Sequence, residues 1–206
     1  AFAAAFVPMF AGSLAVRDHA AARGFAEATL AALLVVLFAL TLVAEFAMPW
    51  IVALIAPGFA GDPVRTPLAI EFTRITFPYL LFISLVSLQG GVLNSIDRFA
   101  AVAATPILLN LCMIAGLLGL VNSLPTPGHA LSWGVLGAGL AQFLFLAWAC
   151  RRAGLPLRLP RPRLSDELKT LLKRMLPVAL GSGAAQINLV VDIIMASLLP
   201  AGSISW

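Results

Sequence analysis

The chain has 206 residues, of which 61% are hydrophobic and 11% are charged, and its formal net charge at pH 7 is +4. Soluble domains carry about 25% charged residues, and a chain of this length does not bury so much apolar surface in a water-soluble core. This composition excludes an ordinary soluble domain and indicates a multi-pass membrane protein. The positive charge does not indicate nucleic-acid binding, because the basic residues lie in short loops between apolar runs.

Apolar runs of spanning length follow one another along the chain. A short run over residues 1–12 is interpreted as the end of a span whose beginning precedes the sequence, as in a fragment. Since about 20 apolar residues cross the hydrocarbon core, complete spans are predicted at residues 29–56, 72–93, 99–121, 131–150 and 177–199. These runs are continuous and not alternating, which favours helices over a closed barrel. The predicted fold class is therefore all-α, a polytopic transmembrane helix bundle.

The basic residues assign an orientation to this bundle. Eleven of the thirteen Lys and Arg residues lie in loops 13–28, 94–98 and 151–176, whereas only Arg65 and Arg74 lie toward the opposite end. Cytoplasmic loops are enriched in Lys and Arg, so the three basic loops are predicted to be cytoplasmic.

The short loop 94–98 is a polar turn between two apolar runs. Arg98 obeys the orientation rule, and Asn94 and Asp97 are expected to supply turn and capping chemistry. The alternative is that this turn belongs to a moving part of the protein.

Segment 151–176 is predicted to contain a cytoplasmic linker and an interfacial helix. Prolines and arginines fill the linker, and Ser165 can cap the helix that follows it. One apolar stripe on this helix consists of Leu168, Leu171, Leu172 and Met175. Such a stripe is typical of an amphipathic helix lying in the membrane surface. Pro177 is expected to turn the chain into the last span.

The last span contains the sharpest candidate site. Asn188 and Asp192 share one face with Gly181, while Gln186 lies on another side. Asp192 is expected to be buried and to need a partner, and hard cations bind carboxylate and amide oxygens. Ion or proton coupling at Asp192 and Asn188 is one interpretation, and a structural hydrogen bond to a neighbouring helix is the other.

Other polar residues and glycines in the spans are assigned structural roles. Glu45 is expected to reach the outer interface, and Glu71 is expected to pair with Arg74 three residues later. Asn110 and Gln142 are expected to form interhelical hydrogen bonds. Close helix packing is predicted at Gly134, Gly137 and Gly139.

No motif for catalysis or for a structural metal emerges from the sequence. The two cysteines, Cys112 and Cys150, lie in or at the end of apolar runs and are interpreted as buried apolar residues. A membrane-bound prenyl transferase would need clustered carboxylates for Mg²⁺, whereas the only adjacent acidic pair, Asp166 and Glu167, begins the interfacial helix. The remaining classes are a transporter and a non-transporting membrane scaffold.

Several short strings, taken in order, give a more specific indication. They are Phe6-Val7-Pro8, Ala56-Pro57-Gly58-Phe59, Thr76-Phe77-Pro78-Tyr79, Leu93-Asn94 with Arg98-Phe99, Thr105-Pro106 with Leu108-Leu109-Asn110, and Gly202-Ser203 with Ser205-Trp206. Their order and spacing resemble the MurJ (MviN) family of lipid II flippases, which belongs to the multidrug/oligosaccharidyl-lipid/polysaccharide exporter superfamily.

This resemblance implies a bacterial inner-membrane protein of fourteen helices in two lobes, with residues 1–176 in the N-terminal lobe and 177–206 beginning the C-terminal lobe. It implies transport without bond-breaking chemistry: an undecaprenyl-pyrophosphate-linked peptidoglycan precursor, lipid II, moves to the periplasmic leaflet by alternating access. The expected partners are lipid II and membrane lipids, and a monomer is expected. A related exporter of another polyprenyl-linked glycan or of drugs is the alternative.

The resemblance also implies roles for particular residues. Asp192 matches a position where some members have a carboxylate that binds sodium, the only cofactor considered. Ser203 and Ser205 match a corner beside the central cavity, and Gln186 is assigned to the same substrate path. The cytoplasmic gate turn is matched by Asn94, Arg98 and Phe99. The ligands of the pyrophosphate group are expected outside residues 1–206.

Overall fold

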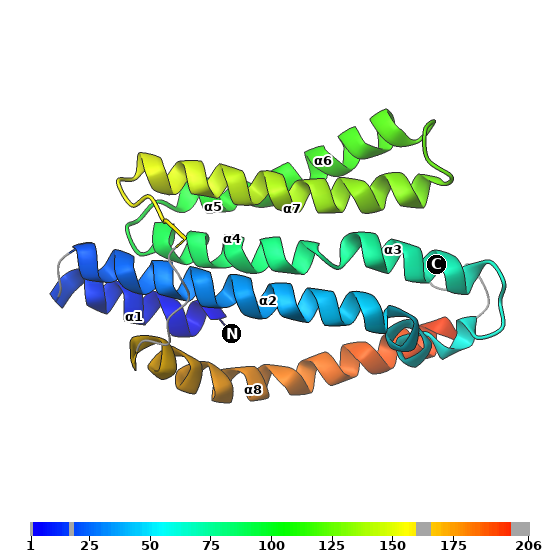
Figure 1. Ribbon diagram of the computed structural model, residues 1–206, viewed down its shortest axis with the longest axis horizontal. Coiled ribbons are helices and arrows are strands. Elements are labelled where there is room, and N and C mark those ends of the chain that lie inside the picture. The colour runs from blue at the N-terminus through cyan, green and yellow to red at the C-terminus, as the bar shows by residue number, and fades with distance from the viewer. Residues whose placement is uncertain (1, 17–18, 160–165, 199–206) are drawn as a thin grey trace.

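The computed structural model describes residues 2–16, 19–159 and 166–198, and in these the regular elements are all helical (Figure 1). In chain order they are α1 (Phe2–Val16), α2 (His19–Ile55), a short 3₁₀ helix η1 (Pro57–Phe59), α3 (Arg65–Thr76), α4 (Tyr79–Asn94), α5 (Phe99–Ala103), α6 (Thr105–Leu120), α7 (Pro127–Arg152) and α8 (Asp166–Ser197). The prediction of an all-α helix bundle is confirmed.

The helices lie side by side in successive layers. In Figure 1, α6 and α7 form one side of the bundle, α3 and α4 lie next to α7, α1 and α2 follow, and α8 lies on the opposite side. The chain therefore crosses the bundle back and forth, and alternate connections lie at opposite ends. The predicted basic loops, where they are described, share one end, which agrees with a common cytoplasmic side.

Within the described ranges, four helical segments have the length and composition to cross a membrane: Ala20–Ile55, Arg65–Asn94, Phe99–Leu120 and Pro127–Arg152. They correspond to the four predicted spans between residues 29 and 150. The first segment begins nine residues earlier and ends one residue earlier than 29–56, the third ends one residue before 121, and the other two extend beyond both predicted ends. The ladder of hydrogen bonds is interrupted at Pro78, because proline lacks an N–H group, and this divides α3 from α4. Pro49, in contrast, lies inside α2 without ending it.

The last predicted span differs from the sequence prediction. Pro177 does not end a helix, because α8 continues through it from Asp166 to Ser197. The first turns of α8 are also not simply interfacial. Leu168 and Leu171 are buried in the main apolar core together with residues of α1 and α2, whereas Leu172 is exposed. The predicted interfacial helix and the last span are thus one continuous helix whose first part packs on the bundle.

Aromatic stacking joins α1 to the rest of the bundle. The rings of Phe6 and Phe10 are stacked at 5.6 Å between centroids, and Phe6 also stacks on Phe25 of α2 at 5.5 Å. Phe6 and Phe10 are completely buried. A Cβ atom at Gly91 of α4 would lie 3.0 Å from the Phe6 ring, so this position must be small for α1 and α4 to pack.

Glycines allow α7 to approach both α6 and α4 closely. A Cβ at Gly116 would lie 2.9 Å from the Cα of Gly134, and one at Gly139 would lie 2.8 Å from the ring of Tyr79. Small residues at such helix contacts let backbones come together in membranes. The prediction of close packing is confirmed for Gly134 and Gly139 but is wrong for Gly137, which faces open space.

Candidate functional site

The turn between α4 and α5 is closed by the backbone. The N–H of Arg98 donates to the carbonyl of Leu93 (2.9 Å), and the N–H of Asp97 donates to the carbonyl of Asn94 (3.3 Å). Asp97 has a positive φ of 58°, the left-handed conformation required at this position of a Schellman motif. The predicted capping by the Asn94 side chain is wrong, because its Oδ1 is buried without a hydrogen-bond partner among the described residues.

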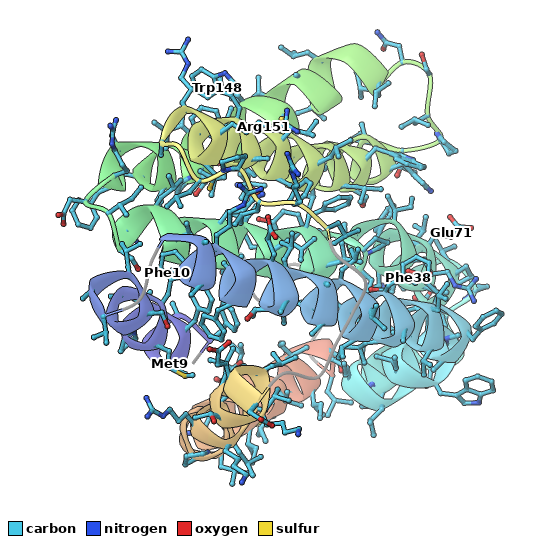
Figure 2. All side chains as sticks on the ribbon, turned by 60° about the vertical axis from the view of Figure 1, so that its left-hand side comes forward. Met9, Phe10, Phe38, Glu71, Trp148 and Arg151 are labelled. Carbon is cyan, nitrogen blue, oxygen red and sulfur yellow. The ribbon has the colours of Figure 1, made fainter. Side chains whose placement is uncertain are left out.

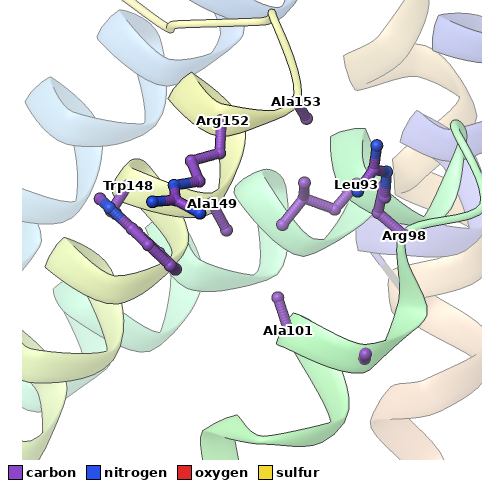
Figure 3. Close-up of a pocket in the computed structure, with 8 residues that line it drawn as sticks. Leu93, Arg98, Ala101, Trp148, Ala149, Arg152 and Ala153 are labelled. Atoms are coloured by element: carbon purple, nitrogen blue, oxygen red, sulfur yellow. The ribbon is translucent and has the colours of Figure 1, made fainter.

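Arg98 and Phe99 follow this turn and are exposed at the predicted cytoplasmic end. Figure 3 shows a pocket of about 240 Å³ beside Arg98. Its lining comprises Leu93, Arg98, Ala100, Ala101, Trp148, Ala149, Arg152 and Ala153. The guanidinium carbon of Arg152 lies 4.8 Å from the centroid of the Trp148 ring, a cation–π contact. Arg98, which precedes α5, and Arg152 of α7 therefore line an otherwise small and apolar pocket.

A carboxylate of α2 fixes the start of the linker between α7 and α8. Oε1 of Glu27 accepts hydrogen bonds from Nε of Arg23 and from the backbone N–H of Arg158, both at 2.8 Å. Leu155, earlier in the linker, is buried against the main core. This part of the predicted cytoplasmic linker is thus held against α2 by one carboxylate and one apolar anchor.

The polar residues predicted on the last span lie on α8, far from the turn after α4. Gln186, Asn188 and Asp192 are all exposed. The expectation that Asp192 is buried is therefore wrong for the described part of the chain. Ser203 and Ser205 lie outside the described residues. The predicted site residues on α8 and the predicted gate turn therefore do not form one site.

Asp192 and Asn188 stand one helical turn apart and offer two oxygen-bearing side chains. No cluster of three or more His, Cys, Asp or Glu residues that could hold a metal ion occurs among the described residues. Two ligands do not complete the oxygen shell of a hard cation. The pair does not form a sodium site by itself, and no ion-coupled step is assigned to it on geometry alone.

The opposite end of the bundle contains a polar network that differs from the prediction. Glu71 contacts Nε2 of His129 at 3.0 Å and does not form the expected pair with Arg74. His129 lies in the first turn of α7. Oε1 of Glu45 is buried without a hydrogen-bond partner among the described residues, and the prediction that Glu45 reaches the outer interface stays a prediction.

Asp62 caps α3 at this same end. Its Oδ1 accepts hydrogen bonds from the backbone N–H groups of Arg65 and Val64, both at 2.9 Å. These two hydrogen bonds lower the pKa of the Asp62 carboxyl below its usual range. Asp62, Glu71 and Arg74 also line an open hollow of about 530 Å³ between the ends of α2 and α3.

Sequence reasoning missed three of these relationships. The spacing of Trp148 and Arg152, four residues apart on one helix, was a readable signal for a cation–π contact. Glu27 lies four residues after Arg23 on α2, and this spacing was also a readable signal for an ion pair. Its contact with Arg158 was not, because 131 residues separate the two.

Comparison with known proteins gives one consistent result. The family model for lipid II flippase MurJ matches residues 1–206. The chain is 42% identical over 201 residues to a probable lipid II flippase MurJ of Rhizobium meliloti, covering 96% of this chain and 38% of that protein. It is 34% identical over 213 residues to the lipid II flippase MurJ of Burkholderia cenocepacia, covering 100% of this chain and 41% of that protein. The chain thus spans about two fifths of the length of these relatives.

Proposed function

Because the chain belongs to the lipid II flippase MurJ family, we propose that it forms part of a transporter that moves lipid II across the bacterial inner membrane. The direction is from the cytoplasmic to the periplasmic leaflet, for cell wall synthesis. The match of the family over all 206 residues carries this proposal. The activity is transport: the substrate is moved across the membrane, and none of its covalent bonds is broken.

The arrangement of the helices supports a place for these residues in an alternating-access transporter. Residues 2–16 and 19–159 form a packed helix bundle, which supports their movement as one lobe. α8 lies at one side of this bundle, next to α1 and α2, and its polar residues Asn188 and Asp192 are exposed. We assign residues 1–176 to the N-terminal lobe and α8 beyond Pro177 to the beginning of the second lobe.

The roles of individual residues form a finer part of the proposal. Asn94, Arg98 and Phe99 form a cytoplasmic gate turn, which the left-handed Asp97 makes tight. Gln186, Ser203 and Ser205 belong to the substrate path. Asp192, with Asn188, contributes oxygen ligands to a sodium ion whose remaining ligands come from other helices. The protein acts as a monomer in contact with membrane lipids.

The transport proposal is tested by complementation. Cells depleted of their own lipid II flippase receive the full-length gene that contains this segment, and growth and the amount of lipid II at the outer leaflet are measured. We expect restored growth together with outward movement of lipid II. Restored growth without such movement, or movement of a different polyprenyl-linked glycan alone, would contradict the substrate assignment.

The ion-coupling proposal has its own matched pair of variants. Asp192→Asn removes a carboxylate from the proposed site, whereas Asp166→Asn removes an exposed carboxylate at the other end of the same helix, where Asp166 contacts Lys169 at 2.9 Å. Sodium binding by the purified full-length protein is measured by calorimetry. We expect weaker sodium binding for Asp192→Asn only. Equal binding by both variants would remove Asp192 from the ion site and leave the transport proposal intact.

A further inference from the structure

The pocket beside Arg98 lies where a membrane lipid has its headgroup. It is formed by the cytoplasmic ends of α4 and α7 and the start of α5, on the side of the bundle away from α8 (Figure 1, Figure 3). Trp148 lines it and is 52% exposed. Tryptophan is enriched at the level of the headgroups, because its ring is apolar and its N–H is polar. The position of Trp148 therefore places the pocket at the cytoplasmic membrane interface.

The charge of this pocket is positive and uncompensated. Arg98 and Arg152 are both exposed, and neither forms an ion pair with a carboxylate among the described residues. The cation–π contact holds the guanidinium of Arg152 against the Trp148 ring. A guanidinium fixed in this way keeps its N–H groups available for a phosphate, whose oxygens match the planar fork of arginine.

An apolar track continues from the pocket into the membrane. Leu140, Leu144 and Trp148 are spaced four residues apart on α7, so they share one face of the helix. They are 47%, 56% and 52% exposed, respectively. Ile107 and Leu111 of the adjacent α6 are also exposed. A hydrocarbon chain can lie along this track while its headgroup remains beside the arginines.

We propose that this pocket binds the phosphodiester headgroup of an anionic phospholipid of the cytoplasmic leaflet, with one acyl chain along Leu144 and Leu140. Basic pockets between transmembrane helices on the cytoplasmic side suit such headgroups. A zwitterionic phospholipid carries an ammonium group that the two arginines repel. Free phosphate has no chain for the apolar track. The site lies outside the α8 residues of the proposed transport path, and its occupancy stabilises the turn after α4 relative to α7.

The experiment uses the fluorescence of Trp148 in the full-length protein. All other tryptophans are replaced by phenylalanine, and the protein is reconstituted in phosphatidylcholine vesicles with a rising fraction of phosphatidylglycerol brominated in its acyl chains. Bromine quenches tryptophan on contact, so quenching reports occupancy of the track. Each sample is normalised to unbrominated vesicles of the same composition, because substitutions near Trp148 change its intrinsic emission.

The matched variants are Arg152→Gln and Arg151→Gln. These arginines are neighbours at the end of α7 and are both exposed, but only Arg152 lines the pocket (Figure 2, Figure 3). A basic residue near anionic lipid is worth about 1 kcal/mol, which is about a fivefold change in apparent affinity. We expect this loss of affinity for Arg152→Gln and for Arg98→Gln. In the double variant the loss is expected to be roughly the product of the two single losses, and Arg151→Gln is expected to change nothing. A second, uncharged variant, Ala100→Leu, fills the pocket without removing a charge and is expected to reduce quenching as well.

Three outcomes would overturn the proposal. Equal losses for Arg151→Gln and Arg152→Gln would show general attraction to a charged surface. Equal quenching by brominated phosphatidylcholine and phosphatidylglycerol would remove the role of headgroup charge. A stoichiometric amount of lipid II could displace the brominated phosphatidylglycerol from the wild-type protein but not from Arg152→Gln. This result would assign the pocket to the transported substrate. Growth in the complementation assay is independent of these readouts, so the transport proposal and this one fail separately.

Discussion

Nε2 of His129, in the first turn of α7, lies 3.0 Å from Oε2 of Glu71 on α3, and the two residues tie these helices together at the outer end of the bundle. The other ring nitrogen of His129 lies 2.9 Å from the hydroxyl of Thr126. A neutral imidazole with its proton on Nε2 satisfies both contacts, since it donates to the carboxylate and accepts from the hydroxyl. Phe72 covers the ring edge-on at 4.9 Å between centroids.

Removal of the Glu71 carboxylate is expected to destabilise the packing of α3 on α7. The imidazole of His129 is 11% exposed, so Glu71→Ala leaves a nearly buried N–H group without its acceptor. We expect a loss of about 1 kcal/mol in the free energy of unfolding, because Glu71 itself is half-exposed and water replaces part of the contact. Denaturant unfolding of the full-length protein in detergent micelles measures this loss. Glu71→Gln keeps an acceptor oxygen and is the control, so an equal loss in both variants would contradict a hydrogen-bonding role.

The close approach of α6 and α7 gives a second prediction. Gly134→Ala places a methyl group 3.1 Å from both the carbonyl oxygen of Cys112 and the Cα of Met113, and backbone atoms cannot move aside as a side chain can. We expect destabilisation of about 1–3 kcal/mol, as for other overpacked sites. Gly137→Ala, one turn along the same helix, meets nothing within 4 Å and is expected to be neutral or slightly stabilising, because alanine favours the helix.

Thermal unfolding of the two glycine variants in the same detergent decides this prediction. A similar melting temperature for Gly134→Ala and Gly137→Ala would show that α6 and α7 separate without cost. The comparison is sharp because the sequence alone places both glycines in the same small-residue pattern.

The spans were predictable because they depend on composition, which is a local property of the sequence. The orientation, which was inferred from the basic loops, stays a prediction. The details that the sequence did not predict depend on contacts between distant segments. Pro177 reads as a helix boundary, yet a membrane helix tolerates an internal proline when neighbouring groups satisfy the freed carbonyl. The packing of Leu168 and Leu171 on α1 and α2 is invisible to a local pattern.

The candidate site was less predictable than the fold for the same reason. The turn at residues 94–98 was located correctly, but its closure by backbone hydrogen bonds with Asp97 in a left-handed conformation replaced the expected side-chain capping. The arginines were interpreted only as markers of orientation. The pocket that Arg98 and Arg152 line with other residues was therefore not predicted. The polar face of α8 was identified from spacing, but spacing does not say which surface such a face contacts.

Gln142 and Asn110 illustrate this limit and give a third prediction. Both amides lie in apolar runs and were expected to form interhelical hydrogen bonds. In the structure, Nε2 of Gln142 donates to the carbonyl of Thr105 (2.7 Å) and Oε1 accepts from the hydroxyl of Tyr79 (3.3 Å), whereas Asn110 is exposed. Gln142→Leu is expected to cost on the order of 1 kcal/mol, and Asn110→Leu is expected to cost nothing measurable. Unfolding of both variants in detergent tests the difference, and an equal cost would contradict the assigned contacts of Gln142.

The contact between η1 and the end of α8 gives the last prediction. The backbone N–H of Gly58 donates to the hydroxyl of Ser197 (3.2 Å), and a Cβ at Gly58 would overlap the carbonyl oxygen of Ser197. Gly58→Ala must therefore move the end of α8 away from η1. Ser197 is only 7% exposed, so such a movement would uncover it.

Thiol labelling measures this movement. Ser197→Cys is introduced in the full-length protein after every native cysteine has been replaced by alanine, and intact cells are treated with a membrane-impermeant maleimide. We expect slow labelling of position 197 with Gly58 present and faster labelling with Gly58→Ala, because the predicted orientation places this end outside the cytoplasm. Gly119→Ala, which meets nothing within 4 Å near the same end of the bundle, is the matched control and is expected to leave the rate unchanged. If labelling is equally slow in all three backgrounds, α8 does not depend on the small size of Gly58 to pack on η1.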